Sequence, residues 1–168
     1  MVRSMSIRVF VTGGTFDKQY NEIDGTLSFS ETHVGHVLDR GRCKLEVKVE
    51  VLMMIDSLDM EAADRVRIVA ALERCAESQV VITHGTDTMV ETAREIAAAG
   101  LGRTVVLTGA MIPFAFGSSD GLFNLGSALS FVQVLPPGVY VAMNGRCFTW
   151  DSVRKNRDLG VFEAIGPA

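Results

Sequence analysis

Apolar residues come in short runs along this chain, and the first run shows the pattern that the others repeat. Residues 7–11 are mostly β-branched or aromatic, and Gly13, Gly14 and Thr15 follow closely. A short apolar run that ends in turn residues is typical of a buried strand, and glycine allows the backbone to approach a ligand closely. Thr15 is therefore predicted to stand at the carboxyl end of a strand, where open α/β sheets bind their ligands.

Two later apolar runs end in the same way. Residues 80–83 lead into His-Gly-Thr-Asp at 84–87, and residues 104–108 lead into Gly109 and Ala110. The carboxyl ends of parallel strands meet at one edge of a sheet. We therefore expect the three strand ends to form one rim of hydroxyls and backbone amides, and we expect the functional site there.

Helical patterns separate the predicted strands. Apolar spacing and cap residues predict helices at 30–41, 60–78, 88–99 and 120–135. Asp59 and Asp120 are expected to cap the second and fourth of these, and residues 88–91 match a capping box. The expected core-facing stripe of the second helix consists of Ala62, Val66, Val69, Leu72 and Ala76. Further strands are predicted at 44–55 and, as the last clear element, at 139–143.

Two segments depart from this alternation. Residues 16–29 are polar and then alternate around Asp24 and Gly25, which predicts a small hairpin. Beside a site turn, such a hairpin is either a lid or a connection without a functional role. Residues 144–168 are polar and weakly patterned, and the charged run at 154–157 would ordinarily be a solvated basic patch.

The alternation of strands and helices with short connections predicts a single α/β domain. We expect a doubly wound, mostly parallel sheet of the Rossmann-like or flavodoxin-like type, with helices on both faces. At 168 residues the chain has the length of one domain, and it buries enough surface to fold without a disulfide or a metal.

Composition and charge exclude several classes of partner. The formal net charge of −4 and the lack of a Lys/Arg run argue against nucleic acid. The three cysteines lie far apart without a CxxC, which favours reduced thiols over a disulfide framework or a zinc site. The chain begins without a signal-peptide pattern, and no run of about 18 apolar residues occurs. We therefore expect a soluble, cytoplasmic protein that does not bind a membrane.

The motifs of several enzyme classes are missing. The sequence lacks the dinucleotide, P-loop and Gly-x-Ser-x-Gly patterns, and none of its histidines has an obvious serine partner. His33 and His36 lie three residues apart, but two histidines without a third ligand are only a weak sign of a metal site. No metal site is predicted.

What remains is a set of hydroxyls with charged neighbours. Thr15 is a candidate nucleophile, because N–H groups of the glycine turn can hold an oxyanion, and its weak hydroxyl needs a base. Thr86 and Asp87 offer a second hydroxyl beside a carboxylate. Lys155 is a candidate base if burial or a neighbouring charge lowers its pKa from about 10.4. On the residues alone, a turn or cap role for Thr15 is the alternative.

Three motifs, taken together, resemble those of bacterial-type L-asparaginases. They are Val-Thr-Gly-Gly-Thr at 11–15, Ile-Thr-His-Gly-Thr-Asp-Thr-Met-Val-Glu-Thr at 82–92 and Thr-Gly-Ala-Met at 108–111. Behind them stands Ser-Asp-Gly-Leu-Phe-Asn-Leu at 119–125. The resemblance covers about residues 7–156 and is confined to the larger, amino-terminal domain of that family. It implies one domain of that type over 1–168, with the second, carboxy-terminal family domain absent.

The resemblance implies catalytic roles for five residues. Thr15 is similar to the family's nucleophilic threonine, and Thr86 and Asp87 are similar to the pair that forms a second triad with a lysine. Lys155 follows the strand-end asparagine by eleven residues, as the family lysine does. Tyr20 is the only tyrosine in the loop where the family has its lid tyrosine.

The resemblance also implies a set of groups that bind the substrate. Ser57 is similar to the serine that holds the substrate's α-carboxylate. Gly14, Gly85 and Ala110 would bring backbone groups close to the amide. Members of the family usually carry glutamine after that serine, where this chain has leucine, and Asp56 is the candidate for the missing contact to the α-amino group.

The implied reaction is hydrolysis of the side-chain amide of asparagine to aspartate and ammonia, without a metal or organic cofactor. Two alternatives stay open: a module that binds an amino acid without turning it over, and an amidase for glutamine or another amide. We expect a small-molecule substrate and a homo-oligomer, either a dimer or a tetramer, because a lone half-site needs cover.

Overall fold

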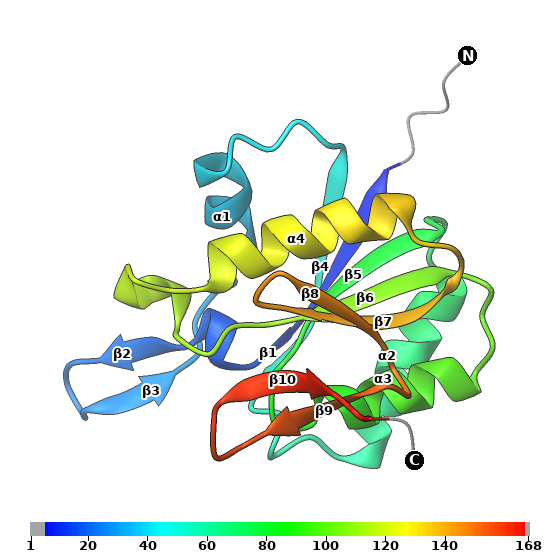
Figure 1. Ribbon diagram of the computed structural model, residues 1–168. Helices are drawn as coiled ribbons and strands as arrows, with labels where there is room; N and C mark the ends of the chain where they lie inside the picture. Colours follow the sequence, from blue (N-terminus) through cyan, green and yellow to red (C-terminus); the bar gives the residue numbers. More distant parts are fainter. Residues whose placement is uncertain (1–5, 167–168) are drawn as a thin grey trace.

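The computed structural model describes residues 6–166, and a six-stranded sheet forms its centre (Figure 1). The strand order is β4-β1-β5-β6-β7-β8. These strands are β1 (Ile7–Gly13), β4 (Val47–Ile55), β5 (Gln79–Thr83), β6 (Thr104–Thr108), β7 (Gly138–Met143) and β8 (Arg146–Thr149). All neighbouring pairs are parallel except β7 with β8. The prediction of a mostly parallel, doubly wound sheet is confirmed.

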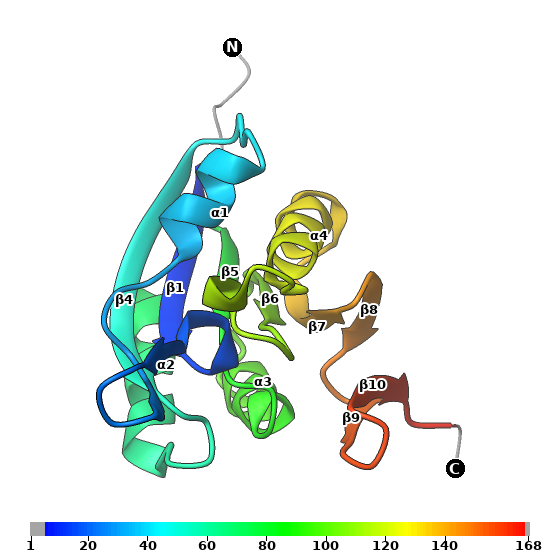
Figure 2. The ribbon, with the colours of Figure 1, turned by 90° about the vertical axis from the view of Figure 1, so that its left-hand side faces the viewer.

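Four α-helices cover the two faces of the sheet (Figure 2). They are α1 (Val34–Arg40), α2 (Ala62–Arg74), α3 (Met89–Ala98) and α4 (Gly121–Val134). Helices α2 and α3 pack on one face, and α1 and α4 pack on the other. None of the helices between residues 6 and 166 has both the length and the apolar character needed to cross a membrane.

The central strands feed two separate hydrophobic cores. Successive side chains on a strand point to opposite faces, so the continuous apolar runs fill both sides. On β5, Val80 and Ile82 pack with α2 and α3, whereas Val81 packs with α1 and α4. All three are fully buried.

Helix α2 differs from its prediction in both its start and its buried face. The helix begins after Glu61 instead of Asp59, because Glu61 and Asp64 form a capping box, in which the Glu61 N–H donates to the Asp64 carboxylate at 3.0 Å. The predicted stripe is confirmed only at Leu72, which is buried, and Val69, which is partly buried against the core, whereas Val66 is 66% exposed. The buried residues of the helix are Ile68, Ala71 and Leu72.

Helix α1 is shorter than predicted because its first turn is held in another conformation. The helix begins at Val34, not at Ser30. A buried carboxylate, Asp17, accepts a hydrogen bond from the His33 N–H at 2.7 Å and from the Thr32 hydroxyl at 3.1 Å. These bonds fix residues 32 and 33 against the turn that follows β1.

Among the described residues, no group of three or more His, Cys, Asp or Glu side chains is arranged to hold a metal ion.

Two hairpins flank the carboxyl edge of the sheet. The predicted hairpin around Gly25 is confirmed as β2 (Gln19–Asn21) and β3 (Thr26–Ser28), and Gly25 has a φ of 73°. The second hairpin, β9 (Val153–Asn156) and β10 (Val161–Ala164), lies in the segment for which no element was predicted. Its strands are only four residues long, and β9 packs beside α3 (Figure 1).

Candidate active site

Glycines allow the ends of β1, β4 and β5 to touch one another. Gly14 has a φ of 77°, and a Cβ atom placed on it would lie 2.4 Å from the Gly85 backbone. A Cβ on Gly85 would in turn lie 2.5 Å from the Ser57 side chain. Such distances leave no room for a methyl group. The three turns that carry the predicted site residues are therefore in direct contact.

Thr15 stands directly after this glycine turn and begins the short 3₁₀ helix η1 (Thr15–Asp17). The N–H of Gly14 donates to the Ile55 carbonyl at 2.9 Å, which ties the turn to the end of β4. The side chain of Thr15 is half-buried, and its hydroxyl has no hydrogen-bond partner among residues 6–166. The structure thus leaves this hydroxyl available at the edge of the sheet, where its role as a nucleophile stays a prediction.

The structure brings Lys155 to Thr86 and Asp87. Its Nζ lies 2.8 Å from Thr86 Oγ1 and 2.8 Å from Asp87 Oδ1. The Lys155 side chain is only 11% exposed, so a solvated position for this member of the 154–157 run is excluded. Because the ammonium donates to Thr86 Oγ1, the hydroxyl hydrogen of Thr86 points elsewhere and is free to donate.

The contact depends on the β9–β10 hairpin, which carries Lys155. Arg154 and Arg157 on either side of it have side chains that are 68% and 63% exposed, as expected for a basic patch. Arg157 also donates to the backbone carbonyl of Asp87 at 3.3 Å. The hairpin is therefore attached to the start of α3 through two basic side chains.

Ser57 is buried beside the start of α3. Its Oγ accepts the N–H of Thr88 at 3.4 Å, and the Thr88 hydroxyl donates to the Ser57 carbonyl at 2.8 Å. The predicted capping box at 88–91 is therefore wrong, although the helix does begin there, because the Thr88 side chain bonds to the β4–α2 turn instead. The Ser57 hydroxyl hydrogen has no acceptor within residues 6–166 and can donate to a ligand.

Asp56 forms an ion pair with Lys18, a residue that sequence analysis missed. Asp56 Oδ1 also accepts the N–H of Leu58 at 3.0 Å. Burial favours a raised pKa for Asp56, but the hydrogen bonds from Lys18 and Leu58 and the charge of Lys155 hold the pKa below its ordinary value. The sequence marks Lys18 only as one charge in a polar loop, since its partner comes 38 residues later.

The structure does not bring Tyr20 to the other predicted residues. Tyr20 lies on β2, it is 60% exposed, and its hydroxyl is close to Gly25 in the tip of its own hairpin. No contact joins it to Thr15 or Lys155 within residues 6–166. A lid role for Tyr20 stays a prediction and requires the hairpin to move.

Ala110 is buried in a turn that two polar side chains, one just before α4 and one in its first turn, hold in place. Asn124 donates to the Gly109 carbonyl at 2.8 Å, and Asp120 accepts the Met111 N–H at 3.0 Å. Asp120 was expected to cap α4, but its side chain makes no capping bond to that helix. Burial opposes ionisation of Asp120, yet the N–H groups of Met111 and Ile112 lower its pKa.

His84 is a fully buried structural residue. Burial, with a smaller effect from the charge of Arg65, lowers its pKa to about 4, so the ring is neutral near pH 7. Its Nδ1 lies 2.7 Å from the Gly85 carbonyl and its Nε2 lies 2.7 Å from the Thr92 hydroxyl. A proton on Nδ1 satisfies both bonds, so His84 fixes the Gly85 carbonyl and takes no part as a base.

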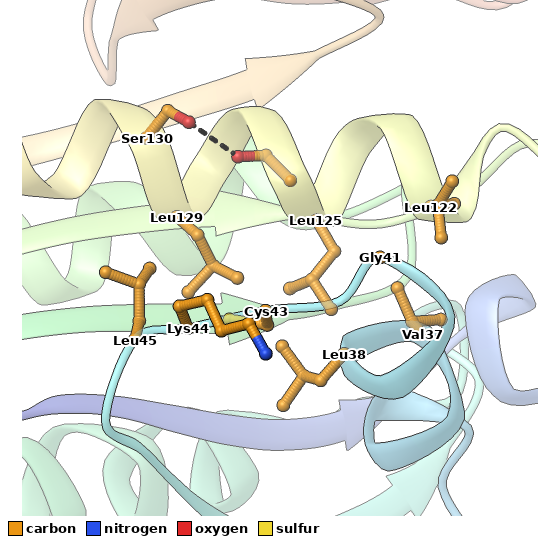
Figure 3. Close-up of a pocket in the computed structure, with 11 residues that line it drawn as sticks. Val37, Leu38, Gly41, Cys43, Lys44, Leu45, Leu122, Leu125, Leu129 and Ser130 are labelled. Atoms are coloured by element: carbon orange, nitrogen blue, oxygen red, sulfur yellow. Dashed lines mark hydrogen bonds between the residues drawn. The ribbon is translucent and has the colours of Figure 1, made fainter.

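A separate hollow lies between α1 and α4 (Figure 3). It has a volume of about 210 Å³. Most of its lining is apolar, and none of the predicted site residues contributes to it. The Ser130 hydroxyl beside it donates to the Gly126 carbonyl of its own helix at 3.0 Å. With no group of converging polar side chains, this hollow is not the site of the predicted chemistry.

Comparisons with known proteins find relatives of this chain in both sequence and fold. The family model "Asparaginase, N-terminal" matches residues 6–164. The L-asparaginase of Thermococcus kodakarensis is 29% identical over 96% of this chain, which is 51% of the relative. Its solved structure has a TM-score of 0.81 and covers 98% of this chain and 52% of its own.

Two further relatives show the breadth of the similarity. The structure of L-asparaginase I from Vibrio cholerae is 26% identical, has a TM-score of 0.83 and covers 95% of this chain and 51% of its own. The 60 kDa lysophospholipase of Homo sapiens is 33% identical over 64% of this chain and 20% of its own length. The chain thus spans about half the length of the Thermococcus relative. With the family model matching nearly all of it, this chain belongs to the asparaginase family, in the part that corresponds to the family's N-terminal domain.

Proposed function

We propose that this domain hydrolyses the side-chain amide of asparagine, with Thr15 as the nucleophile. One observation carries the proposal: the Lys155 ammonium lies 2.8 Å from both Thr86 Oγ1 and Asp87 Oδ1. Thr86 and Asp87 belong to the turn after β5, whose Gly85 touches Gly14 in the turn of Thr15. Lys155 is held by the Thr86 hydroxyl and the Asp87 carboxylate, and the Thr15 hydroxyl stands in the neighbouring turn. Such a set of groups can transfer protons during catalysis.

The steps assign a task to each group. Thr15 Oγ bonds to the carboxamide carbon while its hydroxyl proton passes to Thr86 Oγ1, and Thr86 gives its own hydroxyl hydrogen, which points away from Lys155, to the amide nitrogen. The C–N bond then breaks, and the nitrogen leaves as ammonia with that proton. Water then cleaves the ester that joins Thr15 to aspartate and restores the hydroxyl. These steps use side chains alone, and we propose that no cofactor is required.

The remaining predicted residues bind the substrate in this scheme. The Ser57 hydroxyl donates to the substrate's α-carboxylate, and backbone groups at Gly14, Gly85 and Ala110 surround the amide. N–H groups aimed at the developing negative charge stabilise the transition state. Tyr20 closes over the site when the β2–β3 hairpin moves inward.

The first test measures ammonia release from asparagine by the wild type, Thr15→Ala and Lys155→Met. Thr15→Ala removes the nucleophile, and Lys155→Met removes the ammonium that holds Thr86 for proton transfer. Each change removes transition-state stabilisation, so we expect both variants to lose about 10³-fold or more in kcat/KM. Arg154→Met is the matched control, because it removes a neighbouring charge whose side chain is 68% exposed on the same strand. Equal activity of wild type and Thr15→Ala would refute the proposal.

We also propose that the domain works in the cytoplasm as a homo-oligomer, either a dimer or a tetramer. The free cysteines Cys43, Cys75 and Cys147 suit a reducing compartment. Phe123 on α4 is 59% exposed, which suits an apolar contact with a second copy. Light scattering after size-exclusion chromatography gives the mass in solution, and a monomer at micromolar concentration would contradict this assembly.

A further inference from the structure

The ion pair between Lys18 and Asp56 lies inside the proposed site and has no task in the steps above. The Lys18 N–H donates to the Thr15 carbonyl at 3.2 Å, so the lysine belongs to the same short turn as the nucleophile. Asp56 directly precedes Ser57, the residue proposed to hold the substrate's α-carboxylate. The pair therefore stands where the α-carbon substituents of a bound amide would lie.

Lys18 is held in this position from two sides. Its ammonium pairs with Asp56, and it also lies 6.0 Å from the centre of the Phe29 ring, within the range of a cation–π contact. Its side chain is 19% exposed. A cation arriving with the substrate competes at Asp56 with an ammonium that already has two partners.

The charges around Asp56 add to this effect. Lys155 is close enough to lower the pKa of Asp56, and Arg157 lies 3.9 Å from the carboxylate of Asp87. Both carboxylates therefore already have basic partners. Next to Asp56, the side chain of Leu58 is apolar and Leu58 is 63% exposed. An α-ammonium brought to this place meets like charges, which oppose its binding, whereas a neutral or acylated α-position meets Leu58.

We infer that Lys18 is a specificity-determining residue that favours amides without an α-ammonium over free asparagine. The class consists of ω-amides whose α-position carries hydrogen or an acylated nitrogen, such as succinamate and N-acetylasparagine. The bond cleaved is the same carboxamide C–N bond, and ammonia is again the leaving group. This inference rests on the proposed function and names its preferred substrates, among which asparagine ranks lower.

A second carboxylate in the same turn, that of Asp59, could bind the substrate's α-ammonium in place of Asp56. Asp59 is exposed, and its N–H donates to the Asp56 carbonyl at 3.0 Å. If Asp59 receives an α-ammonium, asparagine remains the better substrate and Asp56 is irrelevant to the choice. Asp59→Asn is therefore the control that separates the two carboxylates.

The experiment compares kcat/KM for succinamate, N-acetylasparagine and asparagine in the wild type, Lys18→Met, Lys18→Arg and Asp59→Asn. We expect the wild type to prefer the two amides without an ammonium by about 10-fold. Lys18→Met frees Asp56 and should lower that ratio at least 10-fold, mainly through a lower KM for asparagine. Lys18→Arg keeps the ion pair and should keep the ratio, and Asp59→Asn should leave it within about twofold.

The outcomes separate this inference from the proposed function. A wild type that prefers asparagine, or a ratio that Lys18→Met leaves unchanged, overturns the inference while amide hydrolysis stands. If no amide releases ammonia, the proposed function fails, and the increase in melting temperature with each compound provides the comparison instead. Greater stabilisation by asparagine than by succinamate in that assay overturns the inference, and the reverse order supports it.

Discussion

At the scale of single residues, the site depends on side chains that are missing as much as on those that are present. Gly14 and Gly85 touch along their backbones, and Gly85 touches Ser57. A φ of 77° makes Gly14 unfavourable for any other residue in any case. Gly85 has no positive φ, so its backbone would accept another residue. A larger side chain is excluded there only because its Cβ would clash with Ser57. The two glycines are therefore constrained for different physical reasons.

Replacing Gly85 with alanine should test the contact directly. The added methyl would lie 2.5 Å from Ser57 Cβ and Oγ, so the β4–α2 turn must shift away from Thr88. We expect a loss of about 1–3 kcal/mol in the free energy of unfolding, as for other overpacked positions, together with a large rise in KM. Urea denaturation and steady-state kinetics measure the two effects. Gly126→Ala, on α4, has nothing within 4 Å of its new methyl and is the control.

At the scale of elements, helix α4 supports the turn that carries Ala110. Asn124 donates to the Gly109 carbonyl and accepts the N–H of Asn144 at 2.9 Å, and it is fully buried. One side chain thus joins the ends of β6 and β7. The φ of 51° at Asn144 shows that the chain turns sharply at this point.

Asn124→Ala should weaken both the turn and the fold. The substitution leaves the buried Gly109 carbonyl without this partner, which costs about 1–3 kcal/mol, and it removes the acceptor of the Asn144 N–H. We expect a lower midpoint of urea denaturation and reduced turnover, because Ala110 is no longer held in place. Ser130→Ala, an exposed position on the same helix, should change neither. Unaltered stability in Asn124→Ala would show that water replaces the lost bonds.

The sequence predicts the central elements well because each fills a buried layer. The strands at 80–83 and 104–108 are continuous apolar runs, and a fully buried strand requires that pattern. Helix α1 was predicted too long because the Asp17 carboxylate competes for the backbone of its first turn, and no local pattern shows that competition. The β9–β10 hairpin was missed because four-residue strands with mostly polar side chains carry little periodic signal.

The site was predictable only where a motif exists. Thr15, Thr86 and Asp87 stand in recognisable strand-end motifs, and Lys155 came from a resemblance in spacing. The Lys18–Asp56 pair depends on a contact between segments 38 residues apart. Charge alone at position 18 does not reveal such a partner, so the structure was needed.

At the scale of the whole molecule, the edge opposite the site is held together by charge. Glu77 accepts from Arg8 at 3.1 Å and from Lys48 at 3.0 Å, and its side chain is 3% exposed. These residues precede or begin β5, β1 and β4, so one carboxylate connects three neighbouring strands. Burial opposes the charge on Glu77, but Lys48 and Arg8 lower its pKa from 4.5 to about 2.

This lowered pKa predicts how stability depends on pH. A carboxyl group with a lowered folded-state pKa stabilises the protein fully above pH 4.5, and the contribution is lost as pH falls through about 2. Glu77→Gln should therefore cost about 2 kcal/mol at pH 7, the scale of hydrogen bonds to charged groups, and almost nothing near pH 2. Urea denaturation at pH 7, 4 and 2.5 tests this. Glu50→Gln, whose side chain is 40% exposed beside the same Arg8, should show a much smaller effect.

The position of Lys155 on a short hairpin also bears on how the protein fails when it is heated. Within residues 6–166, its strand pairs with β10 alone, in a two-stranded ribbon outside the main sheet. Amide groups there should exchange with deuterium long before those of β5, because local opening requires far less energy than global unfolding. Turnover should therefore disappear at temperatures where circular dichroism still reports an intact sheet. If the proposed activity holds, inactivation and denaturation are expected to be two separate events, and an activity assay alone would report a lower stability than that of the main sheet.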